Sequence, residues 1–317
     1  MASEYDEELE ENETDISVEE FAKKLNLEIL HSGGGTMHMA TFNINRPGLQ
    51  LAGYFEHFGK DRVQVLGEME TAYLNQLPPK KRMESVERLF KYDFPCLVVS
   101  GGCQPCEEIN VCAKKYGRAV FKSRSRSTMI INELSIFLNE LLAPRIVIHG
   151  VMLDLYGVGV LMIGKSSVGK SETALELIQR NHRLVADDAV CIKRVSDKLV
   201  GSSPSVIRYM MEVRGIGIVD VRQMYGTGAV RFSQPVDMVV KLENWDYEKQ
   251  YNRLGGETEK YNILGLDVPM YTIPVKSGRN LAAIIEVAAR NHRLKDMGYD
   301  AIEELEQRRR SKTDGGI

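Results

Sequence analysis

Short apolar runs alternate with helical patterns along residues 16–140. The runs Val63–Leu66 and Cys96–Val99 are almost entirely apolar, which is typical of buried strands. Apolar residues at helical spacing predict helices over Met83–Phe90, Glu107–Tyr116 and about Ser127–Leu142, the last of them ended by Pro144. We therefore expect an N-terminal α/β domain over residues 16–140.

A second series of elements predicts another domain over residues 141–317. Strands are expected at Ile146–Ile148, Val151–Leu155 and Val158–Ile163, arranged as a local antiparallel meander. Further strands follow through the 180s to about Leu242, and one helix from Leu281 to about Arg308 closes the chain. The fold class is therefore α/β in both domains.

Length and composition agree with this division. A chain of 317 residues is expected from its length to form two domains. The longest apolar stretch, 146–163, is interrupted by His149 and Asp154, so no membrane span is expected. No basic region followed by an apolar core marks a signal peptide, and five cysteines without a framework are typical of a reducing compartment. We expect a cytoplasmic protein without a membrane partner.

The net charge of −3 is distributed unevenly along the chain. Residues 1–20 carry ten acidic and no basic side chains, which predicts an acidic disordered tail over residues 1–15. An acidic interaction arm is the alternative interpretation. The basic run 308–312 has no interleaved aromatic residues for base stacking, so we expect no nucleic-acid partner.

The strongest chemical signal is the segment Gly164–Ser171, which fits G-x-x-x-x-G-K-S at every position. In such a loop the glycines let backbone N–H groups surround phosphate oxygens, the lysine reaches the β- and γ-phosphates, and the serine hydroxyl binds Mg²⁺. A predicted strand precedes the segment and a predicted helix follows it, which disfavours a chance match. The candidate nucleotide-binding residues are Gly164, Lys165, Ser166, Ser167, Val168, Gly169, Lys170 and Ser171.

Two adjacent carboxylates, Asp187 and Asp188, follow a predicted strand seventeen residues after Lys170. Phosphoryl transfer needs a carboxylate for Mg²⁺ and a group that accepts the proton of the attacking hydroxyl. Adjacent carboxylates near phosphate can divide these tasks between them. A solvated turn is the alternative, and the preceding phosphate loop makes the catalytic interpretation the stronger one.

Other polar residues are weaker candidates. Glu212 could complete a Mg²⁺ shell, although its segment, 211–220, has two glycines that also fit a bulged structural strand. His149 stands at a strand end beside the predicted phosphate loop, and Arg253 could neutralise a transferred phosphate.

A basic loop at residues 274–280 precedes the last predicted helix. Its side chains Lys276 and Arg279, together with the helix N-terminus, could hold an anion. The four cysteines between 96 and 112 contain one C-x-x-C, but the second C-x-x-C of a ribbon-type zinc site is absent. We therefore disfavour zinc or redox chemistry there.

In combination these segments resemble the bacterial HPr kinase/phosphorylase family. The resemblance covers about residues 16–310 and is carried by residues 45–54, 149–150, 164–177, 182–188, 212–218 and 274–280. It implies a homohexameric cytoplasmic enzyme whose catalytic domain is similar to phosphoenolpyruvate carboxykinase. Such an enzyme uses ATP and Mg²⁺ to phosphorylate a serine of HPr, the phosphocarrier of the sugar phosphotransferase system. It also removes the phosphate from phospho-HPr with inorganic phosphate and releases pyrophosphate.

The resemblance also implies roles for individual residues. Asp188 is the proton acceptor in the kinase direction and the proton donor in the reverse direction. The other residues that it implies are His149, Lys170 and Arg253 in the active site, Ser171 and Glu212 for Mg²⁺, and residues 274–279 for dephosphorylation. The chain departs from the common pattern with Lys165-Ser166-Ser167-Val168 for Asp-Ser-Gly-Ile, Asn181 for glycine and Lys276-Ser277 for Arg-Pro.

Two other functions fit the phosphate loop. One is a kinase that acts on a small molecule, and the other is a regulator that binds a nucleotide without catalysis. The presence of Lys170, Asp188 and Glu212 together argues against the second.

Overall fold

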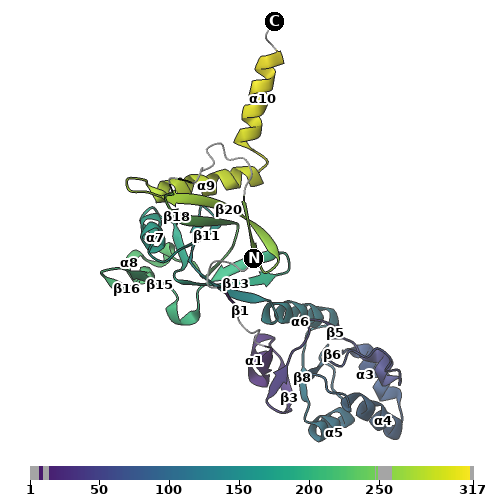
Figure 1. The fold of residues 1–317 in the computed structure, drawn as a ribbon. Helices are drawn as coiled ribbons and strands as arrows, with labels where there is room; N and C mark the ends of the chain where they lie inside the picture. The colour runs from purple at the N-terminus through teal and green to yellow at the C-terminus, as the bar shows by residue number, and fades with distance from the viewer. Residues whose placement is uncertain (1–6, 10–13, 247, 249–258, 315–317) are drawn as a thin grey trace. The chain divides into compact units, whose positions relative to one another are not determined.

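The computed structural model describes residues 7–9, 14–246, 248 and 259–314 (Figure 1). The chain divides into two compact units between Ala143 and Pro144, three residues after the predicted boundary. Each unit has its own sheets and its own apolar core, and we describe each by itself.

The N-terminal unit is a five-stranded sheet in the order β3-β8-β7-β6-β5 with helices on both faces. The strands β5 to β8 are parallel, and β3 is antiparallel to β8. Its elements are β2 Asp15–Ser17, α1 Val18–Lys24, β3 Glu28–Ser32, β4 Thr36–His38, β5 Ile44–Asn45, α2 Gly48–Leu51, β6 Val63–Leu66, α3 Glu68–Gln76, α4 Pro79–Phe90, β7 Cys96–Val99, α5 Glu107–Tyr116, β8 Ala119–Lys122 and α6 Ser127–Leu141.

Successive side chains of the central strands point to opposite faces of the sheet, which explains the layers of this unit. Cys96 and Val98 of β7 pack with α1 and α6, whereas Leu97 and Val99 pack with α4 and α5 on the other face. All four side chains are fully buried, which is why the strand is apolar throughout. The predicted strands β6 and β7 and the predicted helix α5 are confirmed at their bounds.

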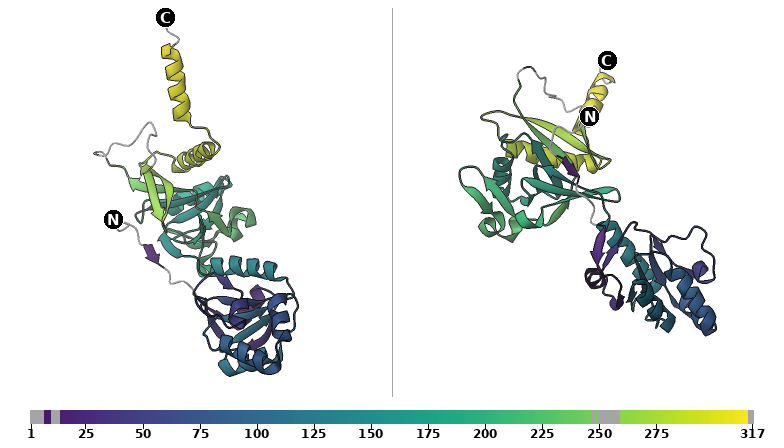
Figure 2. Two further views of the ribbon diagram at one scale, coloured as in Figure 1. Left: turned by 90° about the vertical axis from the view of Figure 1, so that its right-hand side faces the viewer. Right: turned by 60° about the horizontal axis from the view of Figure 1, so that its bottom comes forward.

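The C-terminal unit stacks two sheets and a layer of helices (Figures 1 and 2). One sheet has the order β12-β10-β11-β18-β20-β19, with β11, β18 and β20 parallel, and the other has the order β1-β9-β13-β14-β17. The strands are β1 Glu7–Leu9, β9 Arg145–His149, β10 Val151–Leu155, β11 Val158–Gly164, β12 Arg183–Ala186, β13 Ala189–Val195, β14 Lys198–Ser202, β15 Met210–Val213, β16 Gly217–Asp220, β17 Ser233–Pro235, β18 Met238–Asn244, β19 Glu259–Ile263 and β20 Leu266–Val275.

The described helices of this unit are α7 Lys170–Gln179, η1 Ser205–Ile207, α8 Val221–Tyr225, η2 Thr227–Ala229, α9 Leu281–Asp296 and α10 Ala301–Asp314. Of these, α7 and α9 form the third layer. Apolar residues of α7 and α9 pack on one face of the six-stranded sheet, and the five-stranded sheet packs on the other. Over the described part of the chain, no helix combines the length and apolar character needed to cross a membrane.

The predicted meander is wrong at its first strand. β10 and β11 form an antiparallel hairpin, but β9 pairs with β13 and belongs to the other sheet. The chain changes sheets at Gly150, where a Cβ atom would lie 2.6 Å from the carbonyl oxygen of Met162. Only glycine permits this close backbone approach, so the strand order depends on a contact that local patterning does not reveal.

Two other expectations differ from the structure. The predicted closing helix is divided into α9 and α10, because Gly298 adopts the left-handed conformation (φ +86°) that ends a helix. Within the expected acidic tail, Glu7–Leu9 form β1, which pairs with β9. Strand pairing uses main-chain hydrogen bonds, so an acidic composition does not prevent it.

Gly159 provides a test of the packing between the two sheets. We expect Gly159→Ala to lower the free energy of unfolding of this unit by about 3 kcal/mol, because the added Cβ would collide with the Pro235 carbonyl. Gly228→Ala is the control, since its Cβ would meet no atom within 4 Å. Urea unfolding followed by the emission of Trp245, the single tryptophan, measures both; equal midpoints for the two variants would contradict the packing described.

Candidate active site

The phosphate loop joins β11 to α7 at the edge where three parallel strands end. Gly164 lies against the carbonyl oxygen of Leu242 on β18, where a Cβ atom would collide. Gly169 has a φ of +99° and is the N-cap of α7. Ser167 also has a positive φ, +72°, so this serine occupies a left-handed position that glycine would adopt with less strain. The loop conformation therefore explains the glycines of the motif.

Lys170 is the most buried basic group of the loop, with 7% of its surface exposed. Its ammonium donates to the carbonyl oxygens of Gly164 at 2.8 Å and Lys165 at 3.3 Å. Burial lowers the pKa of Lys170, and the neighbouring charges of Asp188 and Asp187 oppose this shift. The lysine is thus held inside the loop that is predicted to bind phosphate.

His149 connects Lys170 to Asp188. The Lys170 ammonium lies 3.3 Å from His149 Nε2, and His149 Nδ1 lies 3.1 Å from Asp188 Oδ1. An ammonium can only donate, so Nε2 is the acceptor of the first contact, and Nδ1 on the other side of the ring faces the Asp188 carboxylate. The three residues come from the end of β9, the start of α7 and the turn after β12.

Asp188 is directed outward by its backbone. Its φ is +67°, in the left-handed region, and 64% of its side chain is exposed. Its carbonyl oxygen accepts from the N–H of Gly150, which holds the turn against the strand end that carries His149. A non-glycine residue in this conformation indicates a turn held by its surroundings, and here it directs the carboxylate into the cleft.

Asp187 has the opposite environment, with 4% of its surface exposed. Its Oδ1 accepts from the Ser171 hydroxyl at 3.1 Å, and its Oδ2 accepts from the backbone N–H of Glu212 at 3.1 Å. Burial raises the pKa of Asp187, while the Glu212 and Ser171 hydrogen bonds lower it. Asp187 thus links the start of α7 to β15, and it fixes the two residues predicted to bind Mg²⁺.

These residues line one cleft with a volume of about 90 Å³. The hydroxyl of Ser171 and the carboxylates of Glu212 and Asp187 offer oxygen ligands there, the kind that Mg²⁺ prefers when it keeps water and substrate phosphates as further ligands. The lining residues are His149, Val151, Ser166, Ser167, Gly169, Lys170, Ser171, Glu172, Asp187, Asp188, Glu212 and Arg214.

Arg214 was not predicted as a site residue. It lies in the turn between β15 and β16, and its Nη2 is 3.4 Å from the Ser166 hydroxyl. Its neighbours Gly215 and Gly217 have φ values of +83° and +104°, and a Cβ on either would meet no atom within 4 Å. These glycines therefore serve the turn of the β15–β16 hairpin. The shared face of Glu212 and Arg214 was the signal that could have identified Arg214.

The basic loop is not part of the cleft lining. Lys276 lies over the ring of Trp245, 5.0 Å from its centroid, and Arg279 donates to the carbonyl oxygen of Pro274 at 3.0 Å. The loop follows β20, which is separated from β11 by β18 in the same parallel set, so it emerges at the edge that carries the phosphate loop. Arg253 lies outside the described residues.

The four clustered cysteines differ in burial. Cys96 and Cys112 are buried, and burial raises the pKa of both, that of Cys112 to about 11. Among the described residues, no group of three or more histidine, cysteine or acidic side chains could hold a metal ion. Cys103 and Cys106, the two cysteines of the C-x-x-C, are partly exposed.

Two family profiles match the chain. The profile described as HPr Serine kinase N terminus matches residues 16–138, and that described as HPr Serine kinase C-terminal domain matches residues 140–309. The boundary between the two matches falls within a few residues of the boundary between the two units described above.

Curated relatives agree with the profiles over nearly the whole chain. The HPr kinase/phosphorylase of Caldanaerobacter subterraneus subsp. tengcongensis is 50% identical, with 92% of this chain and 97% of the relative covered. That of Listeria monocytogenes is 43% identical, with 92% and 94% covered. A solved structure titled as the Hpr(Ser) kinase/phosphatase from Coxiella burnetii is 38% identical, covers 50% of this chain and 97% of its own, and has a TM-score of 0.46.

The buried carboxylate gives a pH-dependent prediction. Because the folded pKa of Asp187 is raised, its contribution to stability is present below its ordinary pKa of 3.8 and is lost as pH rises through the folded value. Asp187→Asn removes this titration. We expect the stability of wild type relative to this variant to fall with pH above 3.8, as measured by urea unfolding across a pH series. A constant difference would show that Asp187 titrates normally.

Proposed function

The chain belongs to the HPr kinase/phosphorylase family, and from this premise we propose that it is a bifunctional enzyme acting on HPr. In one direction it transfers phosphate from ATP to a serine of HPr. In the other it removes that phosphate with inorganic phosphate. The proposal includes the homohexamer in the cytoplasm that the resemblance implies, and sedimentation of the purified protein tests the oligomer.

The observation that supports this function most directly is the contact chain from Lys170 through His149 to Asp188. It joins a phosphate-loop lysine to an exposed carboxylate. A kinase requires both a cation at the transferred phosphate and a proton acceptor at the attacking hydroxyl, whereas a nucleotide-binding regulator requires only the first.

In the kinase direction, the serine oxygen of HPr forms a bond to the γ-phosphorus of ATP. The bond from that phosphorus to the bridging oxygen breaks, and ADP leaves with the bonding electrons. Asp188 accepts the hydroxyl proton, and His149, whose Nδ1 lies 3.1 Å from Asp188 Oδ1, orients the carboxylate. Lys170 and the backbone N–H groups of the loop stabilise charge on the phosphoryl oxygens.

In the reverse direction, an oxygen of inorganic phosphate attacks the phosphorus of phosphoserine. The bond between phosphorus and the serine oxygen breaks, that oxygen takes the proton held by Asp188, and pyrophosphate is released. Ser171 and Glu212, positioned by Asp187, are the residues that would hold Mg²⁺. When bound, the ion neutralises charge on the phosphates.

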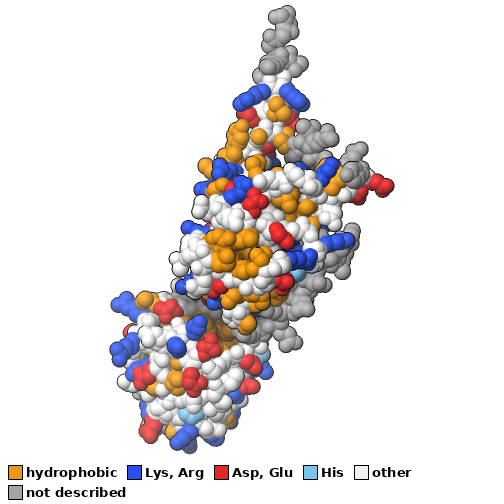
Figure 3. Space-filling view, turned by 90° about the vertical axis from the view of Figure 1, so that its left-hand side faces the viewer, with side chains coloured by type: hydrophobic (Ala, Val, Ile, Leu, Met, Phe, Trp, Pro, Cys, Tyr) orange, Lys and Arg blue, Asp and Glu red, His pale blue; other side chains and the backbone are white. Residues whose placement is uncertain are grey.

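The surface beside the cleft favours a protein substrate over a small molecule. Ile216 and Ile218 lie on the hairpin that also carries Glu212 and Arg214, and each is 76% exposed. Figure 3 shows hydrophobic side chains gathered on one face of the C-terminal unit. Apolar side chains exposed next to a catalytic cleft are typical of a docking surface for another protein.

Incubation with HPr, labelled ATP and Mg²⁺, followed by addition of phosphate, tests the proposal. We expect label to enter a serine of HPr and then to leave it as pyrophosphate. Rapid turnover of ATP on a metabolite, without HPr, would favour the small-molecule kinase instead.

Asp188→Asn tests the proton acceptor. We expect both activities to fall by about 100-fold or more, because the variant keeps the size of the side chain and removes the base. Affinity for Mg²⁺-ATP should change little, as measured by calorimetry. A parallel loss of nucleotide affinity would identify Asp188 as a metal ligand and leave Asp187 as the candidate base.

Lys276→Ala and Arg279→Ala test the basic loop. Free phosphate must be held in line with phosphoserine, whereas ATP carries its own tethered phosphates, so an additional anion-holding loop favours the reverse reaction. Steady-state rates across a phosphate titration should show a larger loss of dephosphorylation than of phosphorylation. Equal losses in both directions would assign the loop to docking or subunit contacts.

A further inference from the structure

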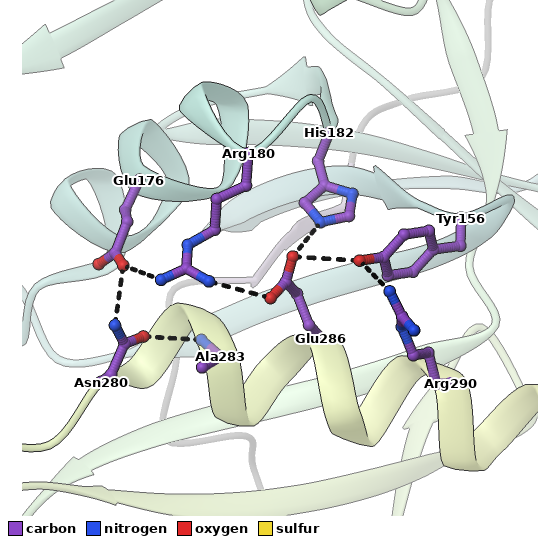
Figure 4. Close-up of polar contacts among 8 residues, drawn as sticks. All are labelled: Tyr156, Glu176, Arg180, His182, Asn280, Ala283, Glu286 and Arg290. Atoms are coloured by element: carbon purple, nitrogen blue, oxygen red, sulfur yellow. Dashed lines mark hydrogen bonds and ion pairs between the residues drawn. The ribbon is translucent and has the colours of Figure 1, made fainter.

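A polar network joins α7, the helix that follows the phosphate loop, to α9, the helix that follows the basic loop (Figure 4). At its centre, Glu286 of α9 accepts from Arg180 at 3.2 Å and lies 2.9 Å from His182 Nε2. At one end, Glu176 of α7 accepts from Asn280 at 3.1 Å and from Arg180 at 2.7 Å. The network thus connects α7 and α9 at several points along their lengths.

Glu176 and Asn280, the two partners of one hydrogen bond in this network, each lie near groups that bind phosphate in the proposed function. Glu176 lies on the helix that begins with Lys170 and Ser171. Asn280 follows directly after Arg279, the last basic residue of the loop. The hydrogen bond between Asn280 and Glu176 is therefore a direct connection between the phosphate-loop helix and the basic loop.

Asn280 makes two hydrogen bonds that require both a donor and an acceptor on its side chain. Its Oδ1 accepts from the N–H of Ala283 at 2.8 Å and caps α9, while its Nδ2 donates to Glu176. An aspartate would keep the cap and would place a second carboxylate against Glu176. The two contacts of Asn280 can therefore be separated by one substitution.

The loop itself is a compact turn whose position depends on its ends. Arg279 donates from its backbone N–H to the carbonyl oxygen of Lys276, and Gly278 has a φ of +83°. Val275 fixes the start by pairing with Asn244 of β18. The end is fixed by Asn280, so a shift of this residue would tilt the whole turn.

Apolar packing alone does not fix α9 along α7. The buried face of α9 consists largely of Ala282, Ile285 and Ala289, which belong to the same core cluster as Ala174 and Leu177 of α7. Such contacts are non-directional and specify no donor–acceptor pairs between the two helices. Hydrogen bonds with defined donors and acceptors supply the missing constraint.

We propose that Asn280 and Glu176 are positioning residues that hold Lys276 and Arg279 of the basic loop at a fixed place relative to the phosphate loop and thereby set the requirement for inorganic phosphate. This inference rests on the proposed function for the phosphate-dependent direction. The positional part of it can be measured independently of activity.

Trp245 supplies that independent measurement. It is the single tryptophan of the chain, and the Lys276 ammonium lies 5.0 Å from its ring centroid. A shift of the loop moves this cation relative to the indole and changes its emission. Lys276→Ala, which removes the ammonium, gives the reference spectrum for a displaced loop.

The experiment compares the full-length wild type, Asn280→Asp, Glu176→Gln and the double variant. Asn280→Asp should raise the phosphate concentration for half-maximal dephosphorylation roughly five-fold, with phosphorylation largely retained and Trp245 emission shifted toward that of Lys276→Ala. In the double variant the amide introduced at position 176 can donate to the carboxylate introduced at position 280, so both quantities should return toward wild type. Glu176→Gln alone can still accept from Asn280 and is the matched control.

Three outcomes overturn the inference. The first is an unchanged emission spectrum in Asn280→Asp. The second is an equal loss of phosphorylation and dephosphorylation in Asn280→Asp together with a lower melting temperature. The third is a double variant in which neither the emission nor the phosphate requirement returns toward wild type. If wild type itself fails to dephosphorylate phospho-HPr, the proposed function fails. The shift and rescue of Trp245 emission then still decide whether Asn280 and Glu176 position the loop.

Discussion

The carboxylate of Asp187 lies in the interior between the phosphate-loop helix and the β15–β16 hairpin, and a carboxylate in such a place must be hydrogen-bonded. Its two oxygens satisfy this need with the Ser171 hydroxyl and the Glu212 N–H. Loss of either hydrogen bond would leave a buried carboxylate oxygen of Asp187 without a partner. The requirement that stabilises the fold here is therefore the same one that brings the two Mg²⁺ candidates together.

The contrast between Asp187 and Asp188 follows from the backbone rather than from composition. The positive φ of Asp188 directs its side chain out of the core while its neighbour stays inside. Burial suits Asp187 to organise hydrogen bonds, whereas exposure and the contact with His149 suit Asp188 to exchange a proton with a docked hydroxyl. Two identical side chains thus acquire different chemistry from one turn.

Local features of the fold and site were predictable from the sequence, and non-local ones were not. The motif Gly164–Ser171 and the helix Glu107–Tyr116 depend on short-range spacing, and both lie where the pattern put them. The change of sheets at Gly150 depends on the Met162 carbonyl of another strand, which no local pattern records. The break at Gly298 did carry a signal, because glycine commonly ends a helix, but helical spacing on both sides masked it.

The parallel strands explain why the phosphate loop and the basic loop share an edge. β11 leads into α7 and β20 leads into α9, so two helix N-termini face the same edge of the sheet, separated by β18. Each carries partial positive charge, and Lys170 and Lys276 add to it. The carboxylates of Glu176 and Glu286 join the two helices through their hydrogen bonds with Asn280 and Arg180. The two helix N-termini and the two lysines suit this edge to hold phosphate oxygens beside the carboxylates of the cleft.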